Sequence, residues 1–173
     1  SSWSVWHQNL TATSQKYVLL NSAGIEASGS TYWPTAPSST LIYTGTSNSN
    51  GGNNDIDFIC YAWKAVDGVS AFGTYTGTGG ALTVTYTGSN SFTAKYILMK
   101  KISGPTSHWC ILDGFRDSGA EYTSRLVSSD TDAEWTSTTI GTTPTSTGFT
   151  FDSGTTDDSV NRSGDTYIYC AFA

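Results

Sequence analysis

Residues 164–173 read GDTYIYCAFA, and residues 55–65 read DIDFICYAWKA. Each segment opens with polar residues, continues with aromatic and β-branched ones, and places a small residue, Ala171 or Ala62, before its last aromatic ring. These residue types suit a pleated strand. Both faces of the strand would be apolar, which predicts a strand covered on both sides. Because the same strand pattern occurs twice in the sequence, we expect an internal repeat.

A second pair of matching segments lies upstream of these two. SSWSVWHQ at residues 1–8 aligns with SHWCILDG at residues 107–114, so that Trp3 falls on Trp109. The two copies are unequal, because residues 70–106 have no counterpart in the first half. Either the chain is a fragment of a longer repeat protein, or something else supplies the missing strands.

The repeat predicts the domain organisation. Residues 1–66 form a partial first repeat, residues 67–71 a linker, and residues 72–173 a complete second repeat. Short strands separated by turn signals predict an all-β chain, with each repeat an antiparallel β-sandwich or jelly roll. We expect strands near residues 3–8, 16–21, 39–44 and 56–64 in the first repeat, and near 72–76, 81–87, 92–101, 108–115, 121–127, 134–140, 147–152 and 165–172 in the second.

Composition narrows the classes of partner. The net charge is −6 and only 13% of residues are charged, with basic residues scattered along the chain. Phosphate binding needs clustered Lys and Arg, so we expect no nucleic acid. The apolar stretches are too short to cross a bilayer, so we expect no membrane insertion. The three Cys fall at positions that do not match between the copies, which predicts no intramolecular disulfide.

Five motifs follow one another in an order and spacing that resembles a known family. They are YTGTGG (75–80), AKYILMKK (94–101), HWCILDGFRD (108–117), GFTF (148–151) and the final GDTYIYCAFA. The family is an uncharacterised repeat domain of tail-fibre-like and other virion proteins of aquatic tailed phages, often described as concanavalin-A-like or lectin-like. The resemblance covers residues 72–173 and, as a partial copy, residues 3–65. It implies a β-sandwich in a virion appendage, hence a virion or extracellular location, and it carries over no catalytic or ligand residue.

No catalytic constellation stands out. The two histidines, His7 and His108, occupy positions that are not equivalent in the two copies, and no GxSxG elbow is present. The glycine-rich GTGG at residues 77–80 precedes the strand-like ALTVTY rather than a helix, so it predicts a hairpin turn and not a phosphate loop. We therefore expect a protein that is not an enzyme and needs no cofactor.

Two acidic clusters are candidate calcium-binding sites. Asp130 and Asp132 lie in one polar segment, and Asp157 and Asp158 in another. Carboxylate oxygens on loops are the ligands that calcium prefers. Neither cluster matches an EF-hand loop, and the polar loops of an acidic protein have the same appearance without any metal.

Three aromatic residues are candidates for glycan binding. Tyr32, Trp33 and Trp135 lie among Ser and Thr rather than inside apolar runs. A ring with an apolar face and a polar edge can stack on a sugar. Packing in the core is the alternative and is favoured, because large aromatic residues are mostly buried.

The missing strands predict an interface. Without them the first copy exposes unpaired edges and apolar faces around Trp3, Val5 and Trp6, and the final strand offers Tyr167 and Tyr169 on a second apolar face. Either the first copy lies against the second and shares its core, or strands of another chain complete it. The latter arrangement would give a homo-oligomer or a polymer.

The leading functional hypothesis is a non-enzymatic tail-fibre or adhesin-like β-sandwich, structural and able to bind a host-surface glycan. One alternative is a purely structural subunit of a filament or a capsid decoration. Another, from a different class, is a polysaccharide-degrading enzyme. Its carboxylate pair would come from the fourteen acidic residues, although nothing in the sequence selects two of them.

Overall fold

The computed structural model describes residues 2–52, 57–88, 90–117 and 119–173. It is all-β with antiparallel sheets, apart from the 3-10 turn η1 (Thr138–Ile140). The strands are β1 (Ser4–Val5), β2 (Lys16–Leu19), β3 (Ala27–Ser28), β4 (Ser70–Thr76), β5 (Leu82–Thr85), β6 (Tyr96–Lys101), β7 (Cys110–Asp113), β8 (Ser124–Arg125), β9 (Trp135–Thr136), β10 (Thr143–Thr145), β11 (Gly148–Phe151) and β12 (Thr166–Phe172).

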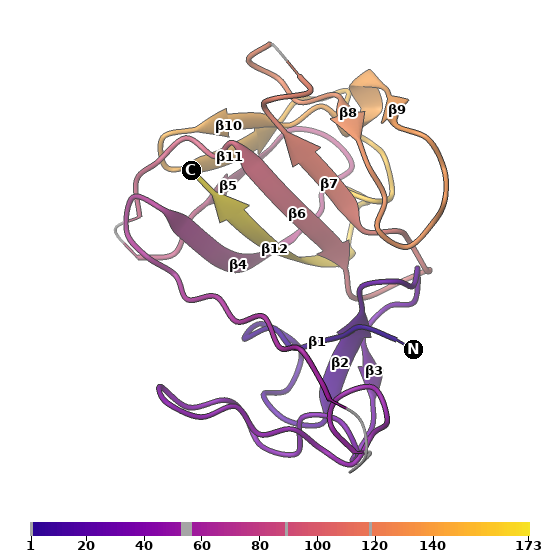
Figure 1. Cartoon of the computed structure of the whole chain (residues 1–173). Helices are drawn as coiled ribbons and strands as arrows, with labels where there is room; N and C mark the ends of the chain where they lie inside the picture. The colour runs from indigo at the N-terminus through magenta and orange to yellow at the C-terminus, as the bar shows by residue number, and fades with distance from the viewer. Residues whose placement is uncertain (1, 53–56, 89, 118) are drawn as a thin grey trace.

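The final strand is the centre of the larger sheet, whose order is β4–β12–β6–β7 (Figure 1). It pairs with β4 on one side and with β6 on the other over almost its whole length. Tyr167, Tyr169 and Ala171 point into the main core, whereas Ile168 packs into a second cluster on the opposite face. The inner face of β12 is therefore fully covered, as predicted, whereas its outer face is covered at Ile168 and only partly at Cys170 and Phe172.

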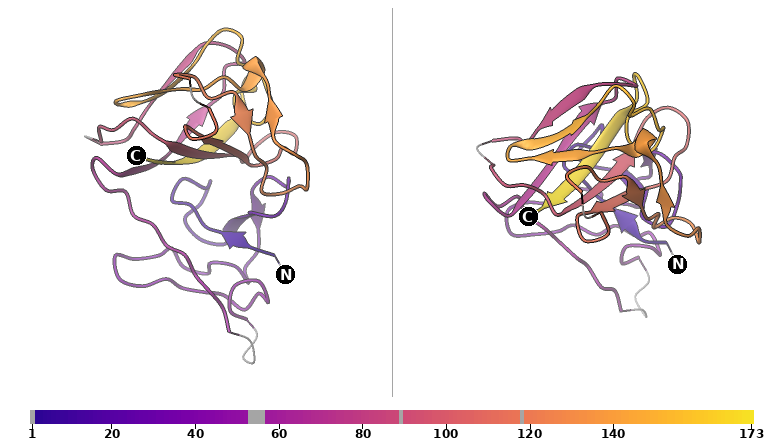
Figure 2. Two further views of the ribbon diagram at one scale, coloured as in Figure 1. Left: turned by 45° about the horizontal axis from the view of Figure 1, so that its top comes forward. Right: turned by 90° about the horizontal axis from the view of Figure 1, so that it is seen from above.

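A three-stranded sheet, in the order β10–β11–β5, faces the larger sheet across the main core (Figure 2). Aromatic rings join the two layers, since the ring of Phe149 lies 5.2 Å from that of Tyr169 and 5.8 Å from that of Tyr75. Gly73 makes room for this packing, because a Cβ there would stand 2.5 Å from Tyr169 Oη. The glycine of the GTYT stretch is thus a packing requirement.

The first half of the chain packs beneath the larger sheet (Figures 1 and 2). We call residues 2–52 and 57–66 the N-terminal lobe. Its one sheet, β1–β2–β3, presents Val18 to a small cluster that also holds Leu10 of the lobe and Trp109 and Ile168 of the second half. The lobe therefore shares a core with the second half, which is one of the two arrangements expected for the first copy.

Two strands predicted in the first half are absent from the described residues. Residues 39–44 form no ladder, and neither do residues 57–64; Ile56, the first residue of the latter prediction, lies outside the described part. Both segments are exposed. The sequence pattern of a strand is present in each, but no neighbouring strand hydrogen-bonds to it. Conversely, β3 and β10 were not predicted, because each is only two or three residues long.

No helix among the described residues is long and apolar enough to cross a membrane.

Candidate functional site

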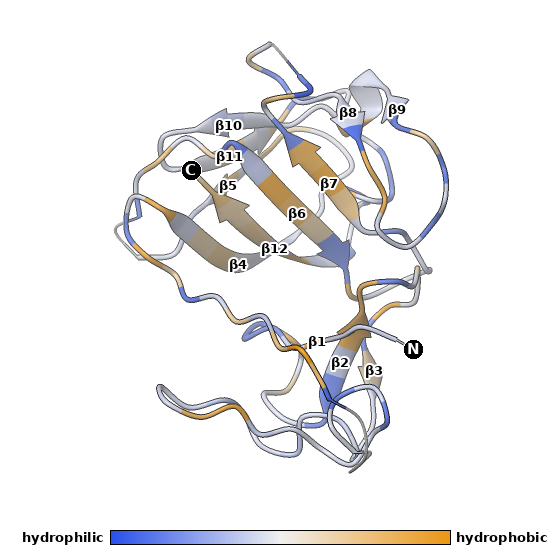
Figure 3. Ribbon diagram, viewed as in Figure 1, coloured by the Kyte–Doolittle hydropathy of each residue, from blue (hydrophilic) through white to orange (hydrophobic). Residues whose placement is uncertain are grey.

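Exposed apolar side chains follow one another along the segment that leads from the N-terminal lobe into β4. Phe58, Ile59, Tyr61 and Trp63, which we call the apolar strip, are all exposed, with Ile59 71% and Trp63 65% accessible to solvent. Figure 3 shows apolar stretches along this segment, outside any sheet. Soluble monomers rarely leave large apolar patches uncovered, and those that persist usually mark contact sites.

The aromatic side chains of the strip stack into a row. The ring of Tyr61 lies 6.4 Å from that of Trp3 and 6.0 Å from that of Trp63, with interplanar angles of 22° and 20°. Trp63 then lines an apolar recess of about 100 Å³ on the outer face of the larger sheet, together with Tyr96, Leu98, Cys170 and Phe172. The strip is therefore continuous with the outer face of the larger sheet.

His7 holds the lobe onto β12. Its Nδ1 accepts a hydrogen bond from the backbone N–H of Asn9 at 3.1 Å, and its Nε2 lies 3.2 Å from the carbonyl oxygen of Tyr169. An accepting Nδ1 and a donating Nε2 define a neutral imidazole. Burial lowers the pKa of His7 from 6.5 to about 4, against an opposing effect of the Tyr169 carbonyl. The ring is thus a neutral structural link.

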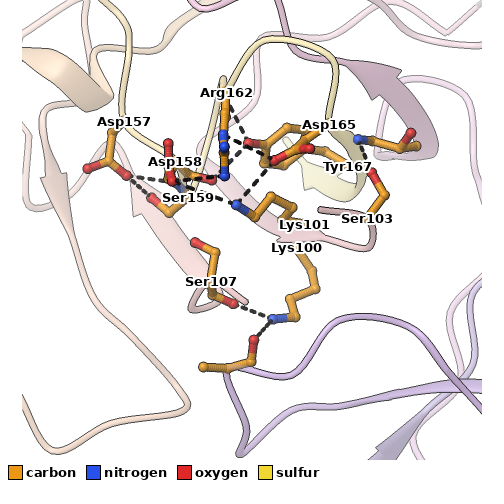
Figure 4. Close-up of polar contacts among 12 residues, drawn as sticks. Lys100, Lys101, Ser103, Ser107, Asp157, Asp158, Ser159, Arg162, Asp165 and Tyr167 are labelled. Carbon is orange, nitrogen blue, oxygen red and sulfur yellow. Dashed lines mark hydrogen bonds and ion pairs between the residues drawn. The ribbon is translucent and has the colours of Figure 1, made fainter. Parts of the chain in front are cut away.

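Lys100 makes a second link between the two halves (Figure 4). Its Nζ donates to the carbonyl oxygen of Ala23 in the lobe at 3.1 Å and to that of Ser107 in the second half. Burial, and to a lesser extent the charge of Lys101, lower the pKa of Lys100 from 10.5 to about 8. A lysine with two carbonyl acceptors and no carboxylate partner contributes to lobe docking rather than to acid–base chemistry.

Lys101 is buried on the inner side of the same strand, in an ion-pair network (Figure 4). Its Nζ lies 3.3 Å from Asp165 and 3.9 Å from Asp158. The same two carboxylates face Arg162, at 3.8 Å and 3.6 Å. Each charge has a partner of opposite sign, so the network anchors the loop before β12 to β6.

A shallow depression of about 430 Å³ lies at the β8–β9 edge. Its lining residues are Arg125, Val127, Asp132, Ala133, Glu134 and Trp135. The Arg125 guanidinium sits 4.5 Å from the centre of the Trp135 ring and 3.0 Å from Asp157. An exposed ring beside a cation and two carboxylates is a surface on which a polar, ring-shaped ligand could rest.

The three predicted glycan-binding residues are not brought together. Trp135 lines the depression at β9, whereas Tyr32 and Trp33 belong to the N-terminal lobe, at the opposite end of the molecule in Figure 1. Tyr32 is half-buried and stacks on Tyr17 at 3.7 Å. Trp33 is only 7% exposed, so its assignment as a sugar platform is corrected to core packing, the alternative that the sequence favoured.

The four predicted calcium ligands are dispersed as well. Asp157 and Asp158 are engaged by arginines, Asp130 lies 3.7 Å from the ring of His108, and Asp132 lines the depression. No group of three or more acidic, His or Cys side chains capable of holding a metal occurs in the described part of the chain. The expectation of one calcium site from these four residues is therefore corrected: they do not converge, and Asp157 and Asp158 pair with Arg125 and Arg162.

The predicted interface residues divide into exposed and buried ones. Trp3 is 51% exposed and belongs to the aromatic row. Trp6 is partly buried and its Nε1 donates to Thr13, while Val5 packs into the cluster beneath the larger sheet. Tyr167 and Tyr169 lie in the main core, so their assignment to an intermolecular interface is corrected, because they fill the space between the two sheets.

Two features were missed at the sequence level. The first is the contact of Lys100 with the lobe. Lys100 and Lys101 are the only adjacent lysines in the sequence, but the burial of Lys100 depends on Ala23, which is distant in sequence. The exposure of the apolar strip was missed because its sequence is that of a central strand. Only its lack of neighbours distinguishes it from β12.

A protein-family model matches residues 1–173, and its description is "Domain of unknown function (DUF7483)". The chain belongs to this family. The match spans both halves, so the unit of the family includes the N-terminal lobe together with the sandwich. No curated protein and no solved structure matches the chain significantly.

Proposed function

We propose that this domain is a non-enzymatic building block of a virion appendage of the tail-fibre or adhesin type, which assembles with neighbouring β-domains through its apolar strip. The observation that carries the proposal is the strip itself. Ile59, Tyr61 and Trp63 are each more than half exposed and lie in a single unpaired segment.

The strip favours an assembly role on energetic grounds. Burial of one large apolar side chain stabilises a protein by roughly 1.5–3 kcal/mol relative to leaving it in water. Four such side chains in the strip therefore represent a substantial driving force for association.

The virion location rests on the resemblance of the motifs to a repeat domain of phage appendages. Its test is direct. Peptides of this chain should be recovered from purified, protease-washed virus particles of its source, and antibodies against the domain should label a projection of the particle. Recovery from the lysate alone, with clean particles, would contradict the proposal.

Glycan binding is a second candidate, favoured by the depression around Trp135. A glycan array probed with the full chain should give hits that are lost in Trp135→Ala and kept in Trp33→Phe, because Trp33 is buried in the lobe. Hits that survive Trp135→Ala would contradict binding at the depression, and an array without hits would leave the purely structural role.

A further inference from the structure

The apolar strip has the sequence of a central strand and no strand beside it. We propose that residues 57–64 form an inner strand of a second β-sandwich, completed by strands of the β4 and β6 type from a segment equivalent to residues 67–106, joined ahead of Trp3 in the same polypeptide. This inference rests on the proposed assembly role and names the partner of the same surface.

The strand β12 is the template for the strip. In the alignment of the two copies, Tyr61 falls on Cys170 and Trp63 on Phe172. In β12 the residue Cys170 pairs with Phe72 of β4 on one side and with Leu98 of β6 on the other. A strand with both faces apolar is covered by a layer on each face, and its two edges need hydrogen-bonding neighbours. Residues 57–64 are exposed and pair with no strand.

The equivalent strands also pair elsewhere in the lobe, in a shifted register. Val5 aligns with Ile111, which bridges to Leu126 within the second half, and Leu126 aligns with Leu20 at the same offset. Val5 pairs instead with Val18 in β1–β2, two residues earlier. The lobe therefore contains both strands of the β1–β2 ladder, and these strands pair with each other.

The second unpaired segment, residues 39–44, can be compared with β11 in the same way. The apolar run Leu41–Tyr43 follows Pro37 as β11 follows Pro144, and β11 pairs with β5. The counterpart of β5 belongs, like those of β4 and β6, to the stretch 70–106, which has no equivalent in the first half. Leu41, Ile42 and Tyr43 are exposed. Residues 57–64 therefore lack both of their template partners, whereas residues 41–43 lack one of two, because the counterpart of β10 lies in the lobe, where the Ser38 N–H donates to the Leu41 carbonyl oxygen at 2.9 Å.

The template fixes the register of the incoming strands. Leu98 pairs with Cys170 on one side and with Ile111 on the other. The residue equivalent to Leu98 should accordingly sit between Tyr61 and Val5, which would give the order β4-type, 57–64, β6-type, β1. Phe58, Cys60 and Ala62 would then face the new core, as Tyr167, Tyr169 and Ala171 do in the observed one.

A second copy of this chain fits the strip less well. Its β4 and β6 are both already paired with its own β12, from Thr166 to Phe172 against β4. Entry of residues 57–64 between them would require β12 to leave the main core. A segment that holds only the β4-, β5- and β6-type strands, as residues 67–106 do, has no final strand of its own and therefore no such competition.

The test is a chain extended by a second copy of residues 67–106, placed directly before residue 1. Ser1 aligns with Ser107, so the junction reproduces the spacing between Thr106 and Ser107. Hydrogen exchange then reports on the backbone amides of residues 57–64, with those of β12 as an internal standard. Amides of a central strand exchange far more slowly than those of an unpaired segment, and we expect at least about 100-fold slowing on extension.

A matched control carries Leu98→Pro in the added copy alone, because proline cannot donate to a ladder. This variant should lose the slowing at 57–64 and keep that of β12. Unprotected amides at 57–64 beside a protected β12 in the extended chain would overturn the proposal. Protection that already exists without the extension and grows with concentration would overturn it too, in favour of a second copy.

Should the extended chain fail to fold, a synthetic peptide of residues 93–104 added to the 173-residue chain is the second measurement. Saturable slowing at residues 57–64 supports the proposal, and its absence at every soluble concentration contradicts it. None of these results depends on a virion location, so failure of the particle analysis and failure of strand pairing are distinguishable.

Discussion

Acidification from pH 7 to pH 5 should weaken the domain through His7. The Nδ1 of this imidazole accepts from the Asn9 amide, so protonation there must break a hydrogen bond while placing a charge in a buried site. Burial lowers the pKa of His7 from 6.5 to about 4. Between pH 6.5 and about pH 4 the imidazole of His7 binds a proton in the unfolded chain but not in the folded chain. Stability is therefore lost as the pH falls below 6.5, and the loss levels off below about 4.

The magnitude follows from the shift. One pKa unit corresponds to about 1.4 kcal/mol, so a fall from 6.5 to about 4 costs about 3 kcal/mol in the acid limit and about 2 kcal/mol at pH 5. Set against a usual stability of about 5–15 kcal/mol, this is a large fraction.

Urea unfolding of the chain and of His7→Gln, at pH 7 and pH 5, isolates the effect, because glutamine does not titrate. The difference in the free energy of unfolding between the two pH values should be about 2 kcal/mol smaller in the variant. An identical pH dependence in both proteins would refute the assignment of a neutral, buried His7. Measurement at pH 5 avoids most of the titration of carboxylates, which lies lower.

Three further predictions concern packing and polar contacts. Gly73→Ala should destabilise the chain by about 1–3 kcal/mol in urea unfolding, because the new Cβ meets the buried Tyr169 ring, and adding Tyr169→Phe should recover part of the loss. Asn161→Ala removes three hydrogen bonds of a buried amide and should cost about 2–4 kcal/mol, whereas Asn90→Ala, with its one exposed bond, should cost less than about 0.5 kcal/mol. Lys100→Met should flatten the pH dependence above pH 8, since the folded pKa of about 8 lies below the unfolded 10.5 and stability gained from this group rises with pH between the two values. An unchanged profile would contradict the buried position of its Nζ.

Local sequence was sufficient for the second half of the fold. The ranges expected around β5, β6, β7 and β11 contain the observed strands, and β12 begins one residue later than expected. Each of these segments finds its partners within residues 70–173. Periodicity and turn signals predict these strands correctly where the chain also supplies the neighbour, although the short β3 and β10 carry too little pattern to be predicted.

The first half shows where this reasoning stops. Residues 57–64 carry the same pattern as β12 but form no ladder, because a strand is defined by pairing and not by its own residues. Trp33 was equally ambiguous, since its polar neighbours in sequence say nothing of the lobe interior in which it packs. The acidic residues do not form a metal site among the described residues, because Asp157 and Asp158 pair with arginines and do not converge with Asp130 and Asp132.

The central claim is that residues 57–64 form a strand when β4- and β6-type partner strands are supplied. The thiol of Cys60 tests this claim. Cys60 is exposed, whereas Cys110 is buried and Cys170 is partly so, with burial raising the pKa of both of these to about 12. Residues 67–106 contain no cysteine, so the extended chain keeps the same three thiols. Alkylation of the native 173-residue chain should show one fast thiol. In the extended chain Cys60 should react at least about 100-fold more slowly, because it takes the place that Tyr169 holds in the observed core. An equally fast Cys60 in the two chains would contradict the account.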